Sequence, residues 1–208
     1  MNSLDNDLIT HRPPNCITDY IAYGFIKFLR FFADLFFAKR YGNRAVVLET
    51  VAGVPGMVGG MFQHLRSLRA CKDDKGWIKE LLDEAENERM HLMTFIQIAQ
   101  PNWFERFLII FVQMWFFAAY FALYILSSKT AHRIVGYLEE EAVISYTQYL
   151  KEIDDKRIKN VAAPEIAITY WKLPENACLR EVVIAARQDE IHHRDRNHSF
   201  ADSLSKNK

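Results

Sequence analysis

Apolar residues recur every three or four positions through most of the chain, and no segment alternates strictly as a half-buried strand does. The sequence therefore predicts an all-α fold, divided into helices by prolines and polar turns. The predicted helices cover residues 19–37, a stretch that opens near residue 43, and residues 77–100, 103–126, 128–153, 164–172 and 174–200. We expect a single domain over residues 1–208, with an N-terminal arm over 1–18 and a disordered tail over 201–208.

Two of these predicted helices are more apolar than the surface of a freely soluble protein. The first carries its polar residues Lys27, Arg30 and Asp34 on one narrow stripe, because positions i, i+3 and i+7 share a helix face. The run over residues 107–126 is interrupted only by Gln113 and is about as long as a bilayer-spanning helix. This pattern fits either a membrane span or an apolar helix that lies in the membrane interface.

The composition narrows the classes of protein. Acidic and basic residues balance at 26 each, so no field of one sign favours a nucleic-acid partner. Cys16, Cys71 and Cys178 form neither a CxxC pair nor an even set, which fits a reducing compartment and no thiolate metal site. The N-terminal segment lacks the features of a secretory signal and of a mitochondrial presequence, so we expect either a bacterial chain or one whose presequence is absent.

Two Glu-x-x-His motifs occur, at Glu88 with His91 and at Glu190 with His193. Positions i and i+3 lie on the same side of a helix, so each motif can direct a carboxylate and an imidazole at one point. A single motif means little, because chance alone yields about half a match in a chain of this composition. The two motifs therefore need support from the residues around them.

That support comes from four glutamates on apolar helix faces. Glu88 and Glu190 interrupt apolar stripes in the middle of their helices. Glu139 shares a face with apolar residues, and Glu49 is the only charged residue over 45–65. Burying an unpaired carboxylate is costly or forces it to protonate, so four inward glutamates require compensating positive charge.

Two metal ions would supply this charge. One glutamate from each of two helices, with one Glu-x-x-His from each of two others, is the ligand set of ferritin-like di-iron and di-manganese proteins. Oxygen-rich ligation with two imidazoles suits iron or manganese better than zinc or copper. Each residue taken alone is more often solvated or salt-bridged, whereas all six together favour a ferritin-like four-helix bundle that holds a di-iron site.

The ligands also bear on the membrane alternatives. A single span over 107–126 would put the candidate ligands that precede it and those that follow it on opposite sides of the bilayer, where they could not share a site. We therefore expect this helix and the one over 19–37 to form a monotopic apolar face that enters one leaflet.

Four segments of the chain closely resemble the alternative oxidases, the cyanide-insensitive quinol oxidases of mitochondria and some bacteria. They are LETVAGVPGMVGG from residue 48, NERMH from residue 87, LEEEA from residue 138 and RQDEIHHRDRNH from residue 187. The resemblance covers residues 28–200 and implies a single di-iron oxidase domain. Such an enzyme oxidises ubiquinol or a similar quinol and reduces dioxygen to water while bound to one leaflet of a bacterial or mitochondrial inner membrane.

The resemblance also implies roles for individual residues. Its metal ligands, to two non-haem iron ions, fall on Glu49, Glu88, His91, Glu139, Glu190 and His193. Its redox-active tyrosine falls on Tyr146, and residues that orient the ligands fall on Asn87, His132, Tyr170, Trp171 and Asp189. Its quinol pocket falls on Arg30, Asp34, Arg44, Leu48, Glu141, Ala142 and Ser145. Ser145 stands where a threonine is expected, and Cys16 is given no regulatory role.

Two other functions stay open at this point. A di-iron hydroxylase of a quinone precursor or a lipid would use the same metal ligands. A ferritin-like iron-binding protein would share the ligands without needing Tyr146 or a membrane face. The native quinol, the source organism and the oligomeric state are also open. A second copy of the chain is a candidate partner in a homodimer, because the apolar helices carry many aromatic side chains.

Overall fold

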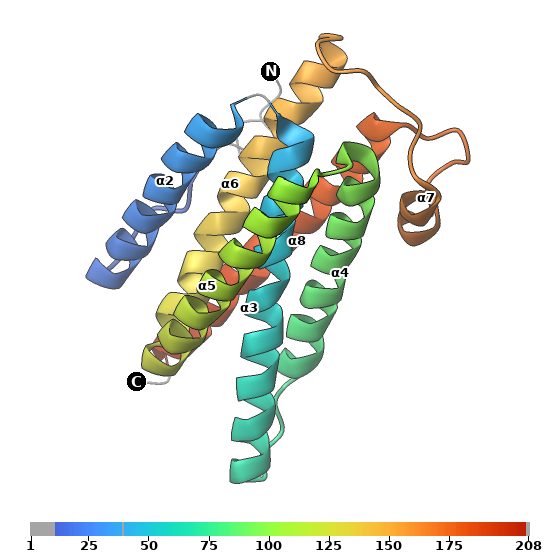
Figure 1. The fold of residues 1–208 in the computed structure, drawn as a ribbon. Helices are drawn as coiled ribbons and strands as arrows, with labels where there is room; N and C mark the ends of the chain where they lie inside the picture. Colours follow the sequence, from blue (N-terminus) through green and yellow to red (C-terminus); the bar gives the residue numbers. More distant parts are fainter. Residues whose placement is uncertain (1–10, 39, 207–208) are drawn as a thin grey trace. The chain divides into compact units, whose positions relative to one another are not determined.

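The computed structural model describes the chain over residues 11–38 and 40–206. These residues form the helices α2 (Ile17–Phe37), α3 (Tyr41–Ala70), α4 (Trp77–Ala99), α5 (Trp103–Leu126), α6 (Ser128–Asp154), α7 (Glu165–Trp171) and α8 (Leu179–Lys206) (Figure 1). Over the described residues there is no strand, only an isolated bridge between Ala162 and Cys178. The predicted all-α class is therefore confirmed.

The chain is organised as two compact units. The first unit holds the described residues up to Tyr41 together with those from His132 onward, and thus α2, most of α6, α7 and α8. The second unit is Gly42–Ala131, which contains most of α3 together with α4 and α5. The single domain expected from the sequence stays a prediction.

In the second unit, α3 and α4 run side by side (Figure 1) and approach closely at Gly56. A Cβ atom on Gly56 would lie 2.3 Å from the backbone oxygen of Leu81 and 3.0 Å from the Cβ of Ala85. Only glycine leaves room for this backbone contact. Polar contacts also join α3 to α5, because the side chain of Gln113 donates a hydrogen bond of 3.2 Å to the Thr50 carbonyl oxygen.

The first unit is built on contacts between α6 and α8. The ring of His198 on α8 packs against Gly136 on α6 so closely that a Cβ atom on Gly136 would lie 2.5 Å from it. The Nε2 atom of His198 lies 2.9 Å from Oε1 of Glu140. The helix α2 joins α6 through the buried ion pair of Arg133 with Asp19, at 3.2 Å. These contacts fix the three long helices of this unit in one register.

The C-terminal helix differs from the prediction at both ends. It begins at Leu179 and not at Pro174, because residues 174–178 form a turn in which Ala177 donates its N–H to the Pro174 carbonyl. The expected disorder from residue 201 is wrong for 201–206, since α8 continues to Lys206. Asp202 explains this, because its carboxylate accepts hydrogen bonds from Arg12 and Arg133 at 2.8 and 2.5 Å. Residues 207 and 208, like residues 1–10 of the arm, lie outside the described residues.

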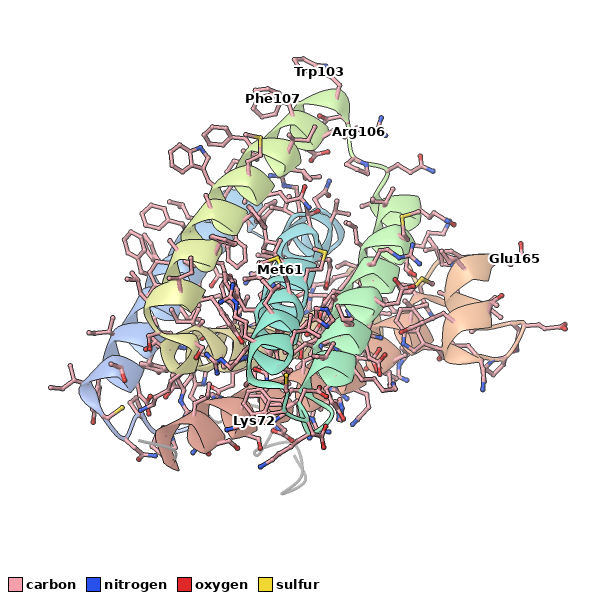
Figure 2. The ribbon with its side chains drawn as sticks, turned by 90° about the horizontal axis from the view of Figure 1, so that it is seen from below. Met61, Lys72, Trp103, Arg106, Phe107 and Glu165 are labelled. Carbon is pink, nitrogen blue, oxygen red and sulfur yellow. The ribbon has the colours of Figure 1, made fainter. Side chains whose placement is uncertain are left out.

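By length and composition, two of the described helices are able to cross a membrane, α3 and α5. The two helices differ in burial. In α3, 72% of the most apolar stretch is buried, whereas in α5 only 11% of the corresponding stretch is buried. Figure 2 shows Trp103 and Phe107 pointing away from α5, and both are exposed. The helix α2 also exposes large apolar side chains, at Ile17, Tyr20, Ile21, Phe25, Phe28, Phe31, Phe32, Leu35 and Phe36.

Candidate metal centre

The second unit brings three of the six candidate ligands together. Glu49 comes from α3, and Glu88 and His91 come from successive turns of α4. The Nδ1 atom of His91 lies 3.4 Å from Oε2 of Glu49 and 3.5 Å from Oε2 of Glu88. The three side chains are buried, with His91 fully inaccessible and Glu88 only 1% exposed.

This geometry fits a metal ion. Ligand atoms bind iron-like cations at about 2.1 Å, so neighbouring ligands on one ion lie about 3 to 4 Å apart. The one ligand atom that each of the three residues offers lies within 4.8 Å of the other two. Two buried carboxylates in this position are stabilised by a cation, because their charge would otherwise be desolvated and mutually repelled.

The first unit carries the other three candidate ligands. Glu139 lies on α6 and is 2% exposed, and Glu190 and His193 lie one turn apart on α8. The Nδ1 atom of His193 lies 3.7 Å from Oε2 of Glu190, as the i, i+3 spacing predicts. Each unit therefore supplies the same set, one glutamate from one helix and a Glu-x-x-His pair from another.

His132 on α6 contacts α8 close to the candidate ligands of that helix. Its Nδ1 atom is 3.0 Å from the Asn197 side-chain oxygen, and the Asn197 amide donates a hydrogen bond of 3.1 Å to the His193 carbonyl. Burial lowers the pKa of His132 to about 4, although the Asn197 hydrogen bond opposes the shift. His132 is therefore neutral at physiological pH, and Asn197 links it to the helix turn that carries His193.

The other residues expected to orient ligands lie in different settings. The indole nitrogen of Trp171 donates a hydrogen bond of 2.8 Å to Asp189, the residue before Glu190. Tyr170 is 36% exposed and stacks edge-on against Trp171. Asn87 is half-buried on α4, directly before Glu88. Trp171 thus contacts Asp189 directly beside the candidate ligand Glu190.

Tyr146 lies on α6, two turns beyond Glu139, and is 4% exposed. Positions seven apart on a helix share a face, so its ring and the Glu139 carboxylate leave α6 on the same side. Burial keeps the phenol away from bulk water.

The residues expected to bind quinol divide between the units. In the first unit, the Arg30 guanidinium on α2 lies 2.8 Å from Asp34 and 3.1 Å from Glu141 on α6, whereas Ala142 and Ser145 are half-buried on α6. In the second unit, Arg44 is buried and Leu48 is half-buried, both on α3.

Two further residues contact Glu141 that sequence reasoning did not assign to the site. The Glu141 Oε1 atom lies 2.7 Å from the Lys27 amine and 2.7 Å from Nε2 of His11. Burial alone would raise the pKa of Glu141, but the hydrogen bonds from His11 and Lys27 and the charges of Lys27 and Arg30 lower it to about 2. The place of Lys27 on the polar stripe of the first predicted helix could have indicated its role. His11 lies in an irregular segment, where no sequence pattern indicates a contact.

The described residues define an all-α protein whose buried carboxylates and imidazoles fit a metal site. The family model described as "Alternative oxidase" matches residues 1–202. The chain belongs to the alternative oxidase family.

Several curated relatives are similar over nearly all of the chain. "Ubiquinol oxidase, mitochondrial" of Batrachochytrium dendrobatidis is 60% identical over 93% of this chain and 61% of the relative. "Ubiquinol oxidase 1a, mitochondrial" of Oryza sativa subsp. japonica is 60% identical over 94% and 59%. "Ubiquinol oxidase, mitochondrial" of Mangifera indica is 57% identical over 97% and 63%. The chain thus spans about three fifths of the length of these relatives.

Proposed function

We propose that this chain is a quinol oxidase, which oxidises ubiquinol or a similar quinol and reduces dioxygen to water. Two quinol molecules supply the four electrons and four protons that convert one dioxygen into two water molecules. Family membership supports the proposal, and so do the names of the relatives. The observation that carries it is the repeated donor set, one glutamate and one Glu-x-x-His pair in each unit.

The six donors, Glu49, Glu88, His91, Glu139, Glu190 and His193, would hold two non-haem iron ions, as in the di-iron bundles built from this ligand set. When bound, the iron pair supplies the electron transfer to dioxygen. Oxygen-rich ligation favours iron or manganese over zinc and copper, and we assign iron because the resemblance of the sequence motifs implies it. The chain's part is to hold the carboxylates and imidazoles in the core on rigid helices, and the bond from Asn197 to the His193 carbonyl supports the turn that carries His193.

Tyr146 is the residue we assign to donating an electron, together with its phenol proton, during oxygen reduction. Its burial and its place on the same face of α6 as Glu139 support this role. Burial limits the escape of the oxidised side chain into side reactions with solvent.

The quinol would bind at Arg30, Asp34, Arg44, Leu48, Glu141, Ala142 and Ser145. Arg30 and Asp34 support this site, because they form a polar stripe on α2, whose other exposed side chains are largely apolar. A lipid-soluble quinol needs an apolar approach and a few hydrogen-bonding groups for its two hydroxyls.

We propose that α2 and α5 attach the protein to one leaflet of the mitochondrial inner membrane. Both helices expose rows of large apolar side chains, and α5 is the less buried of the two described helices that are both long and apolar enough to span. The relatives named above are mitochondrial, so the bacterial alternative gains no support from them. A homodimer also stays a proposal.

Membrane attachment is tested by extraction and topology. Alkaline carbonate should leave the protein in the membrane pellet, and tags at the two termini should be accessible from the same side. Release by carbonate, or tags on opposite sides, would contradict attachment to one leaflet.

The rival enzyme is a di-iron hydroxylase, and the rival binding protein is a ferritin-like iron store. Product analysis separates them. Purified protein given ubiquinol should consume oxygen and yield ubiquinone, with two quinols oxidised per dioxygen. A hydroxylated product would favour the hydroxylase, and iron uptake without quinol turnover would favour the iron store.

A further inference from the structure

The carboxylate of Glu141 lies among three basic side chains from outside its own helix. Its Oε1 atom contacts Lys27 and His11, each at 2.7 Å, and its Oε2 atom lies 3.1 Å from Nη1 of Arg30. Glu141 is 6% exposed, so water reaches its carboxylate little, although the Lys27 side chain itself is 42% exposed. Lys27 and Arg30 come from adjacent positions on the polar stripe of α2.

Every nitrogen of the Arg30 guanidinium has an acceptor. Nε donates to Asp34 at 2.8 Å, Nη1 donates to the backbone and side-chain oxygens of Glu141 at 3.1 Å, and Nη2 donates to Gln148 at 3.0 Å. The guanidinium is planar, so these contacts fix the direction of its remaining N–H. The orientation of Arg30 therefore depends on where the Glu141 carboxylate lies.

Lys27 contacts Oε1 of the Glu141 carboxylate, whereas Arg30 contacts Oε2. Its ammonium group lies 2.7 Å from Oε1 of Glu141 and 2.8 Å from Nε2 of His11. The His11 nitrogen either carries a proton or accepts one, so it serves only one of its two polar contacts at a time. The Lys27 ammonium group offers three donors and no acceptor, which makes it the constant partner of Glu141.

We propose that Lys27 is a positioning residue for quinol binding, which holds Glu141 so that Arg30 and Asp34 present a fixed set of hydrogen-bonding groups. This inference rests on the proposed function and adds a residue to its quinol site. Lys27 itself does not have to touch the quinol.

If Lys27 only anchored α2 to α6, its loss would disturb the fold and not quinol binding in particular. The helix is already held to α6 by the Arg133 ion pair with Asp19, in which both residues are 2% exposed. Loss of Lys27 leaves that buried pair intact, so fold and metal content should persist. What changes is the freedom of Glu141 and, through it, of Arg30.

The test compares Lys27→Met, which removes the charged group and keeps an unbranched side chain one atom shorter, with Lys27→Arg, which keeps the charge. Lys27→Met should raise the KM for ubiquinol about fivefold to twentyfold with kcat within about twofold, because ground-state binding is weakened. Lys27→Arg should restore most of the loss. Lys79→Met is the matched control, since Lys79 pairs with Asp83 on the exposed face of α4. Iron content and helical circular dichroism are measured for each variant.

An unchanged KM in Lys27→Met would overturn the proposal, and so would a rise in KM accompanied by loss of iron or helix. Binding of a short-chain oxidised ubiquinone, followed by fluorescence quenching, needs no turnover. Weaker quinone binding by Lys27→Met than by the unmodified chain supports the positioning role even if no oxygen is consumed. Equal binding contradicts it, whereas absent oxygen uptake bears on the oxidase proposal alone.

Discussion

The Nδ1 atom of His91 on α4 lies 3.4 Å from Oε2 of Glu49 on α3, in a core where both side chains are buried. Residues 42 positions apart in the sequence are thus held at the separation of two ligands on one ion. Because the chain places carboxylates around this imidazole, a metal ion is the cation that best stabilises them.

Removing a ligand should therefore abolish metal binding and turnover together. Glu88→Ala and His193→Ala are expected to lower both iron content and quinol oxidation, turnover by more than about a hundredfold. Glu86→Ala is the control, because Glu86 is exposed on the same helix and pairs with Arg89. Full iron content in either ligand variant would contradict the assignment.

Tyr146→Phe should separate metal binding from turnover. The substitution keeps the buried ring and removes only the hydroxyl, so iron should stay bound while turnover falls by about a hundredfold or more. Tyr149→Phe is matched to it, since Tyr149 is also 4% exposed on α6 and stacks on Tyr41. Substantial turnover in Tyr146→Phe would remove the redox role.

Gly56→Ala should destabilise the protein, although alanine favours helices. The new Cβ would lie 2.3 Å from the Leu81 carbonyl oxygen, so α3 and α4 must move apart, at a cost of about 1–3 kcal/mol. Gly53→Ala, one turn earlier, meets only ordinary contacts at 3.5 Å and should be neutral or stabilising. Urea unfolding in detergent measures both, and equal midpoints would show that the close approach is not required.

His132 should make the protein less stable in acid. Its folded-state pKa of about 4 lies below the ordinary 6.5, so the unfolded chain takes up a proton first as the pH falls. Stability is lost between about pH 6.5 and 4, by about 2 kcal/mol from pH 7 to 5. His132→Gln should lose this part of the pH dependence, whereas His64→Gln, at an exposed position, should keep it. Identical pH profiles for the three proteins would argue against a buried, neutral His132.

Much of the fold could be predicted from the sequence, because helix ends follow local chemistry. The helix predicted over 103–126 agrees with α5 at both ends, where the structure shows Asn102 capping it with Glu105 and the apolar run stopping at Leu126. The C-terminal end of α8 departs from the prediction because Asp202 pairs with Arg12, a residue 190 positions away that no local pattern reveals.

In the candidate site, too, local spacing could be predicted from the sequence and long-range contacts could not. The i, i+3 motifs predicted that Glu88 with His91 and Glu190 with His193 would each point to one place, and the distances agree. The contacts of His11 and Lys27 with Glu141 depend on tertiary packing between an irregular segment, α2 and α6. Periodicity alone does not contain that information.

The most direct test of a di-iron quinol oxidase measures iron content and ubiquinol-dependent oxygen uptake on the same purified, detergent-solubilised preparation, with and without cyanide. The expected result is about two iron ions per chain and oxygen uptake that cyanide leaves unchanged. A preparation that oxidises quinol without bound iron, or that binds iron and oxidises no quinol, would contradict the account.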